Sequence, residues 1–265
     1  MKILEFIDKF ETEYPPSTAF DGDNPGLLVG DKNDEIKAVL TTCDVDEGVV
    51  REAMEKGANL IVSHHPLMFS PISTLTEDNA ESRAIRLMIQ NGISLYSAHT
   101  NLDVGAGGIN DLMASILGIT DTSVIDVVGD NERGTYGYGR RGRLASPVTL
   151  GELMKKVIDT FGADGLRYAG NPDTVIKHIG VSTGGGARIL YDAIELGCDC
   201  FITGDIKYNG FRDAVDCGMC VIDLMHYDSE QISKKWFADY INRIDASIPV
   251  SMSTANTNVV KTYTK

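Results

Sequence analysis

Short apolar runs alternate with helix-like segments along this chain, and this order limits the fold more than any other feature of the sequence. The strand-like runs of the first half are 36–41, 60–63 and 93–98, and the helix-like segments are 46–56, 80–90 and 107–117. Asp46 can cap the first of these helices, and Gly57 can end it. A repeated strand–helix order predicts an α/β fold with a largely parallel sheet and helices on its faces.

A second strand–helix series begins at residue 136. Its strands are expected at 136–144, 175–181, 201–203 and 220–224, with helices at 151–161 and 189–196, another between the last two strands, and a final one running through Trp236 to about 243. Residues 121–135 lose the helical period and gather Asp, Gly and Asn, so we place the change between two lobes there. We expect interleaved lobes, 1–125 with 226–265 and then 126–225, because candidate site residues come from both ends of the chain.

Composition argues against several classes of partner. The formal net charge is −14, whereas a nucleic-acid-binding surface needs clustered Lys and Arg, as does a polybasic membrane patch. No apolar run is long enough to span a bilayer, and acidic residues fall too early for a signal peptide. The five cysteines are odd in number and lie in apolar contexts, which favours a reducing, cytoplasmic location.

Two adjacent histidines end the second strand-like run. His64 and His65 follow the apolar residues 60–62 and lead into Pro66, which prevents a helix from starting there. Adjacent strand residues point to opposite sides, but at a strand-to-loop corner two imidazoles can reach two neighbouring metal ions. The alternative is one core histidine and one surface histidine.

The next strand places a histidine and a carboxylate at a corresponding position. His99 follows the run 93–98, and Asp103 comes four residues later. Since ligands of open α/β sheets bind at the carboxyl ends of strands, Asp103 can supply a hard oxygen ligand beside the imidazoles. Asn101 and Asp103 are also common turn residues, which is the competing interpretation.

The last strand leads into His226 and Glu230. Four residues apart in a helix, their side chains share a face and can hold one metal ion or two. A capped helix start with an acid in its first turn would explain the same residues. Clustering favours a site, because four of the five histidines follow three predicted strands.

These segments together resemble the Nif-three-like family, whose bacterial members include YbgI-like proteins and are often labelled GTP cyclohydrolase 1 type 2 homologues. The resemblance covers nearly the whole chain and is carried by residues 23–30, 63–69, 98–103, 202–208 and 226–230. It departs at three positions, where the family usually has tryptophan, histidine and glycine and this chain has Gly22, Asn209 and Met225.

The resemblance implies a dinuclear centre and an assembly. It implies that His64, His65, Asp103, His226 and Glu230 bind two divalent metal ions, with Glu230 bridging them. It places His99 nearby, either supporting the ligands or carrying protons. It also implies a homo-oligomer, a toroidal hexamer. Such mixed imidazole and carboxylate ligands suit zinc, iron, manganese or nickel.

The expected function is that of a metal-dependent hydrolase acting on a small molecule, a nucleotide or a related phosphorylated compound. Two ions can share and deprotonate a water molecule. The alternative is a non-catalytic protein in which the metal site serves storage, regulation or partner contacts. An enzyme needs an open metal position facing a pocket, whereas a store does not.

Overall fold

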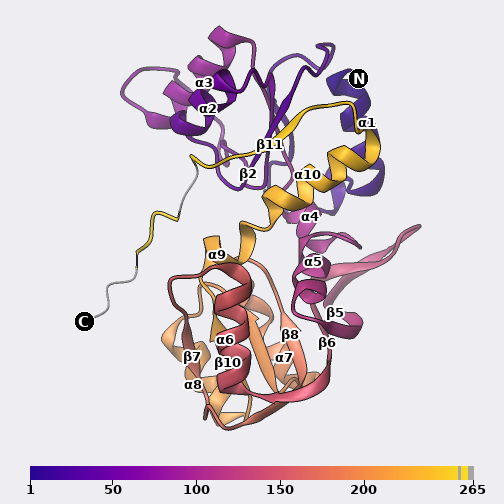
Figure 1. Ribbon diagram of the computed structural model, residues 1–265, viewed down its shortest axis with the longest axis vertical. Coiled ribbons are helices and arrows are strands. Elements are labelled where there is room, and N and C mark those ends of the chain that lie inside the picture. The colour runs from indigo at the N-terminus through magenta and orange to yellow at the C-terminus, as the bar shows by residue number, and fades with distance from the viewer. Residues whose placement is uncertain (256–257, 262–265) are drawn as a thin grey trace. The chain divides into compact units, whose positions relative to one another are not determined.

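The chain divides into two interleaved units (Figure 1). The computed structural model describes residues 1–255 and 258–261. The first unit comprises Met1–Leu102 and 233–255, and the second comprises Asp103–Ile232 and 258–261. The predicted α/β fold with two interleaved lobes and largely parallel sheets is confirmed, with antiparallel strands at the sheet edges.

The unit boundaries differ from the sequence prediction of 125/126 and 225/226. Residues 103–125 belong to the second unit because Met113, Leu117 and Ile119 pack into its core. Residues 226–232 also belong there, since Gln231 Nε2 donates to the Phe161 carbonyl at 2.9 Å.

The first unit is built on a five-stranded sheet of order β1-β4-β3-β2-β11. Its strands are β1 (Gly26–Val29), β2 (Val39–Thr42), β3 (Leu60–Ser63), β4 (Ser94–Ser97) and β11 (Val250–Met252). Its helices are α1 (Ile3–Glu13), the 3-10 turn η1 (Pro16–Thr18), α2 (Glu47–Glu55), α3 (Ala80–Asn91) and α10 (Ser233–Ile244), while α4 (Thr100–Val104) crosses the unit boundary. All pairings except β1–β4 are parallel.

Both faces of this sheet are covered. Helices α2 and α3 bury Val49, Ala53 and Met88 against one face. Aromatic side chains of α1 and α10 gather on the other, where Phe10 contacts both Tyr96 of β4 and Tyr240 of α10. Two-sided burial explains the short, continuously apolar strands of the sequence.

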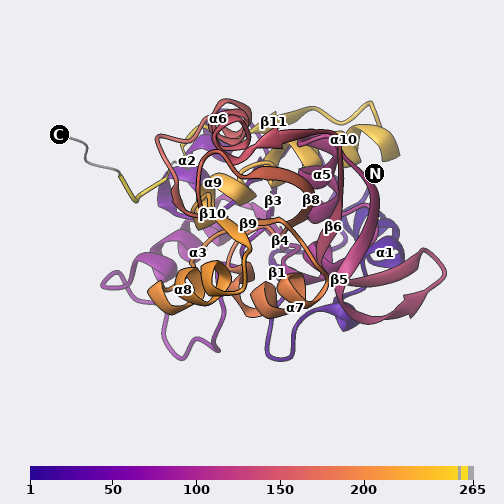
Figure 2. The ribbon, with the colours of Figure 1, turned by 90° about the horizontal axis from the view of Figure 1, so that it is seen from below.

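The second unit has a six-stranded sheet of order β5-β6-β8-β9-β10-β7. Its strands are β5 (Ile119–Asn131), β6 (Gly134–Thr149), β7 (Arg167–Ala169), β8 (Val175–Val181), β9 (Cys200–Thr203) and β10 (Cys220–Asp223). Its helices are α5 (Ile109–Ile116), α6 (Leu150–Phe161), the 3-10 turn η2 (Gly186–Ile189), α7 (Leu190–Glu195), α8 (Tyr208–Asp216) and α9 (His226–Glu230). Figure 2 shows α6 on one side of its central strands and α7 and α8 on the other.

Helix ends follow local sequence chemistry. The Asp46 side chain accepts a hydrogen bond from the Val49 amide at 2.8 Å and so caps α2, as predicted. Thr149 and Glu152 form a capping box at the start of α6. Gly92 ends α3 with φ +61°, a conformation that glycine adopts without a steric penalty.

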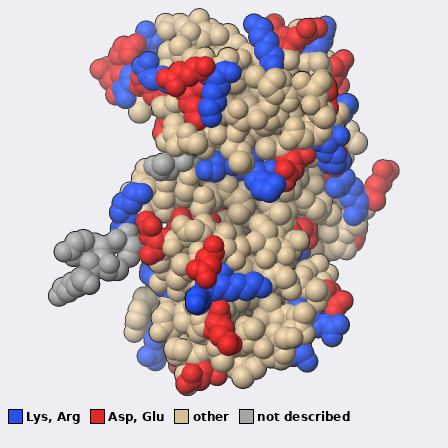
Figure 3. Space-filling view, viewed as in Figure 1, with Lys and Arg blue, Asp and Glu red and all other residues tan. Residues whose placement is uncertain are grey.

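On the face shown in Figure 3, basic and acidic side chains are interspersed and form no basic stripe. Among the described helices, none combines the length and apolarity needed to cross a bilayer.

Candidate metal centre

Three histidines of the first unit lie together beyond the ends of neighbouring parallel strands. His64 and His65 follow β3, and His99 follows β4. The ring centroids are 5.1 Å apart for His64–His65, 5.3 Å for His64–His99 and 5.4 Å for His65–His99. Each ring offers a nitrogen within 4.8 Å of the other two. Strand β3 ends at Ser63, so His64 and His65 lie beyond it. Their side chains therefore need not point to opposite sides of the sheet, and the two rings lie side by side.

Each of the three rings has its Nδ1 atom held by a hydrogen-bond acceptor. The acceptors are the Ala98 carbonyl for His64 (2.9 Å), Asp44 Oδ1 for His65 (2.6 Å) and Asp23 Oδ1 for His99 (2.8 Å). When Nδ1–H donates in a neutral imidazole, the lone pair lies on Nε2, which is the form that binds metal ions. The same arrangement at three clustered rings fits a metal site.

Asp23 is a buried carboxylate that orients His99. Burial alone would raise its pKa, but hydrogen bonds from His99, the Thr100 hydroxyl and the Asn24 amide outweigh burial and hold the pKa well below its usual range. The Thr100 amide also donates to Asp23, at 3.1 Å. Asp23 therefore stays ionised and can stabilise a proton on His99.

A second group forms in the second unit, around α9. His226 and Glu230 lie one turn apart, with Nε2 and Oε2 at 3.0 Å. Nδ1 of the same ring lies 2.7 Å from Asp205 Oδ2. A ring between two carboxylates needs a proton or another cation facing each of them. A metal ion between His226 and Glu230 would meet that need at Nε2.

Glycines make room for this group. The loop 182–186 follows β8, and Gly184 sits there at φ +58° with the space of its missing Cβ taken by Glu230. Its amide donates to Ser229 Oγ at 2.8 Å. A Cβ at Gly204, after β9, would lie 2.8 Å from the backbone nitrogen of His226. Gly184 and its hydrogen bond to Ser229 thus form a cradle for Glu230.

Asp103 belongs to the same unit and contacts the same loop. Thr183 Oγ1 lies 3.4 Å from Asp103 Oδ1, and the side-chain amide of Asn110 donates to the Asp103 backbone carbonyl at 3.0 Å. Buried Arg140 supports the following turn by donating to the carbonyls of Val104 and Gly105. Asp103 is therefore held by tertiary contacts, beyond what a simple turn residue requires.

The residue before His226 carries backbone strain. Met225 has φ +69° and ψ 154°, a combination normally restricted to glycine. Its amide donates to the buried carboxylate of Asp223 at 2.9 Å. Asp223 also accepts from the Ile206 amide at 3.1 Å and pairs with Arg167. This network holds the start of α9 in place.

The structure thus brings His64, His65 and His99 together in one unit, and Asp103, His226 and Glu230 in the other. Sequence reasoning did not assign the orienting roles of Asp23, Asp44, Asp205 and Gly184; for Asp205 it left open a place in the cleft or a surface ion pair. A signal existed for two of them. Asp44 follows β2 and Asp205 follows β9, and each of these strands lies beside one that a histidine follows. Asp23 and Gly184 act through tertiary contacts that no local sequence pattern predicts.

Comparison with known proteins gives consistent matches over most of the chain. The family model described as Duf34/NIF3 (NGG1p interacting factor 3) matches residues 1–259. A GTP cyclohydrolase 1 type 2 homolog of Clostridium perfringens is 39% identical over 231 residues, covering 87% of each chain. One from Lactococcus lactis is 38% identical over 261 residues, covering 97% of this chain and 98% of the relative. The crystal structure of a hypothetical protein of Staphylococcus aureus superposes with a TM-score of 0.91 at 31% identity, covering 99% of both chains.

Proposed function

The chain belongs to the Duf34/NIF3 family, and from this membership and its histidine clusters we propose that it is a metal-dependent hydrolase with a dinuclear centre. The residues that would hold the two ions are His64, His65, Asp103, His226 and Glu230, and Glu230 would be shared between them. The substrate is a small phosphorylated molecule, a nucleotide or a related compound. The observation that carries the proposal is the set of three rings whose Nδ1 atoms are all held by acceptors.

The donor set suits zinc, iron, manganese or nickel. Carboxylate or carbonyl partners on ligand histidines fix the ring orientation and raise its basicity, and such partners are common in metal sites. His65 has such a partner in Asp44, and His226 has one in Asp205. For His64 the partner is the Ala98 carbonyl.

Candidate ligands lie close in sequence to the two points where the chain passes from one unit to the other. The chain passes from the first unit to the second between Leu102 and Asp103, so Asp103 is the first residue after the crossing. It passes back between Ile232 and Ser233, two residues after Glu230. Candidate ligands thus stand next to both crossings.

When bound, a pair of divalent ions supplies a deprotonated water and stabilises developing negative charge. The protein's own contribution to proton transfer is the His99–Asp23 pair. His99 is part-exposed, and ionised Asp23 stabilises the imidazolium that forms when the ring takes up a proton. Phe69, 56% exposed and edge-on to His99 with ring centroids 5.3 Å apart, offers an apolar contact for a substrate.

A panel of nucleotides and phosphoesters, screened with the metal-loaded protein, tests this proposal. We expect turnover that Asp23→Asn lowers about 10–100-fold while metal content is retained, the usual effect of losing an outer partner of an active-site histidine. Asp31→Asn, a change at an exposed loop aspartate, is the matched control. A full metal complement without turnover on any substrate would favour the non-catalytic storage or scaffold role.

Family membership also leads us to propose a homo-oligomeric assembly, a hexamer. Light scattering across a concentration series tests it. A particle of one chain at every concentration would refute it.

A further inference from the structure

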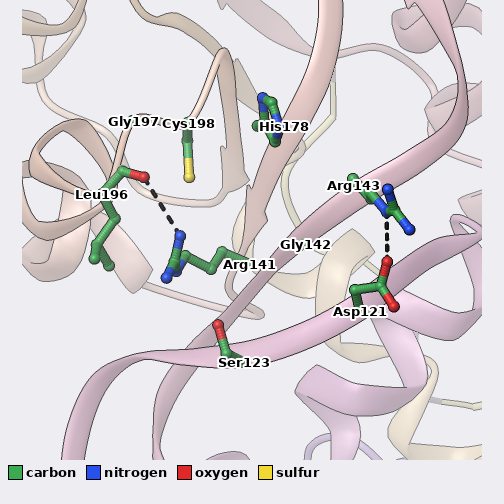
Figure 4. Close-up of a pocket in the computed structure, with 9 residues that line it drawn as sticks. All are labelled: Asp121, Ser123, Arg141, Gly142, Arg143, His178, Leu196, Gly197 and Cys198. Carbon is green, nitrogen blue, oxygen red and sulfur yellow. Dashed lines mark hydrogen bonds and ion pairs between the residues drawn. The ribbon is translucent and has the colours of Figure 1, made fainter.

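A pocket of about 420 Å³ opens in the second unit, on the face of the sheet that carries α7 (Figure 4). Its lining residues are Asp121, Ser123, Arg141, Gly142, Arg143, His178, Leu196, Gly197 and Cys198. Cys198 precedes β9, whereas Asp205 and the other residues around His226 follow the carboxyl end of that strand. The pocket therefore lies at the opposite ends of the strands from His226 and Glu230, and it contains none of the candidate metal ligands.

Strand register gathers cationic side chains on this face. Arg141 and Arg143 are two residues apart on β6 and so point to the same side. Ser123 of β5 is paired with Arg141, and His178 of β8 is paired with Arg143. The partner of Arg141 on β8 is Gly180, and the space of its missing Cβ is taken by Phe201 and Cys198, the second of which lines the pocket.

Arg141 is the residue that most needs a ligand. Its Nη1 atom donates to the Leu196 carbonyl at 3.5 Å, at the limit of a hydrogen bond. Its Nε atom is buried and has no hydrogen-bond partner among the described residues, and no carboxylate there forms an ion pair with it. Buried guanidinium N–H groups are normally satisfied, so an acceptor from outside the chain fits this position.

The remaining charges leave this position open to an anion. Asp121 is paired with Arg143, and Asp199 Oδ2 is engaged by the amides of Lys177 and His178. His178 Nδ1 lies 3.6 Å from the same carboxylate. Burial raises the pKa of the Cys198 thiol to about 11, so the thiol adds no negative charge near neutral pH.

We propose that this pocket binds the phosphate group of a small phosphorylated metabolite, with Arg141 and Arg143 as the principal donors. Arginine matches phosphate geometry through paired N–H groups. The pocket volume lies within the range of sites for small organic ligands, and this favours a phosphorylated molecule over free phosphate. The competing role for Arg141 is simply to cap the end of α7 through Leu196.

Isothermal titration of the full chain with ribose 5-phosphate, inorganic phosphate and unphosphorylated ribose separates these roles. Each titration is made at constant ionic strength, on the protein as purified and after chelation of metals, so that binding at the metal centre is distinguished. We expect saturable binding of ribose 5-phosphate that survives chelation, weaker binding of inorganic phosphate, and none of ribose. Equal affinity for the two phosphates would assign the site to free phosphate and overturn the metabolite proposal.

Variants locate the binding. Arg141→Gln is expected to weaken ribose 5-phosphate binding about tenfold or more, because a charge-assisted hydrogen-bond pair is lost. Ser123→Glu, at an exposed position that tolerates substitution, places a carboxylate in the pocket and is expected to do the same without unfolding the protein. Arg212→Gln, at an exposed arginine of α8, is the control. No saturable binding by the wild type, or equal binding by folded Ser123→Glu protein, would overturn the proposal.

Discussion

Gly184 passes so close to Glu230 that a Cβ at residue 184 would lie 1.9 Å from Oε1 of the glutamate. The same glycine has φ +58°, which disfavours any side chain. A backbone position in the loop after β8 thus fixes where the proposed bridging carboxylate lies, although Gly184 carries no chemistry of its own.

Replacing Gly184 tests whether it positions Glu230 or is only a residue of the loop. We expect Gly184→Ala to lower the free energy of unfolding by about 1–3 kcal/mol, the usual range for a strained backbone position, and to lower metal content because Glu230 is displaced. Gly185→Ala is the matched control, since its Cβ would meet nothing closer than 3.6 Å and its φ is −82°. Urea unfolding measures the stability of both variants, and metal analysis measures their metal content. If Gly184→Ala and Gly185→Ala do not differ in either property, Gly184 does not position Glu230.

The strained backbone of Met225 predicts an unusual response to glycine. Relief of strain of about 1–3 kcal/mol should offset the added freedom of the unfolded chain, so Met225→Gly should leave stability unchanged or raise it. Met54→Gly, in the exposed part of α2, should instead lower the free energy of unfolding by about 1 kcal/mol. The measurement is chemical denaturation of both variants, and an equal loss in both would show that residue 225 is unstrained.

Glu52 predicts a specific dependence of stability on acid. Burial would raise its pKa, but Lys56, the Ser253 hydroxyl and the amides of Thr254 and Ala255 outweigh burial and lower it to about 2. Because the folded-state pKa is depressed, the stabilisation is full above the ordinary pKa of about 4.5 and is lost as the pH falls towards 2.

Glu52→Gln should therefore lower the free energy of unfolding at neutral pH by about 2–3 kcal/mol and make its decline between about pH 5 and pH 2 shallower. Glu55→Gln, at an exposed position of the same helix, should do neither. Unfolding followed by circular dichroism across this pH range decides the matter. An unaltered slope in Glu52→Gln would mean that its carboxylate does not carry the effect.

The strands and the histidines that follow their carboxyl ends could be predicted from the sequence. The runs at 60–63 and 220–223 are buried because both faces of their sheets are covered. His64 directly follows the first run, and His226 comes three residues after the second. His64, His65 and His99 could be grouped in advance because parallel neighbours bring their carboxyl ends to one edge.

The unpredicted parts depend on exposed or long-range contacts. Strand β5 is mostly solvent-exposed and so carries no apolar alternation, which is why residues 121–131 appeared to be a connection between lobes. The boundary at Asp103 depends on the Arg140 hydrogen bonds to the carbonyls of Val104 and Gly105, between residues more than thirty positions apart. Asp23 reaches His99 across 76 residues of sequence, a separation that local patterns cannot report.

The most direct test of the account is the metal content of the purified protein, measured by inductively coupled plasma mass spectrometry. The account predicts about two divalent ions per chain in the wild type, and sharply fewer in Glu230→Ala because loss of a bridging carboxylate disturbs both ions. His178→Ala, which removes the histidine that lies outside both candidate ligand groups, should keep the wild-type content. A Glu230→Ala protein with its full metal complement would contradict the bridging assignment and the dinuclear centre on which the proposed hydrolysis depends.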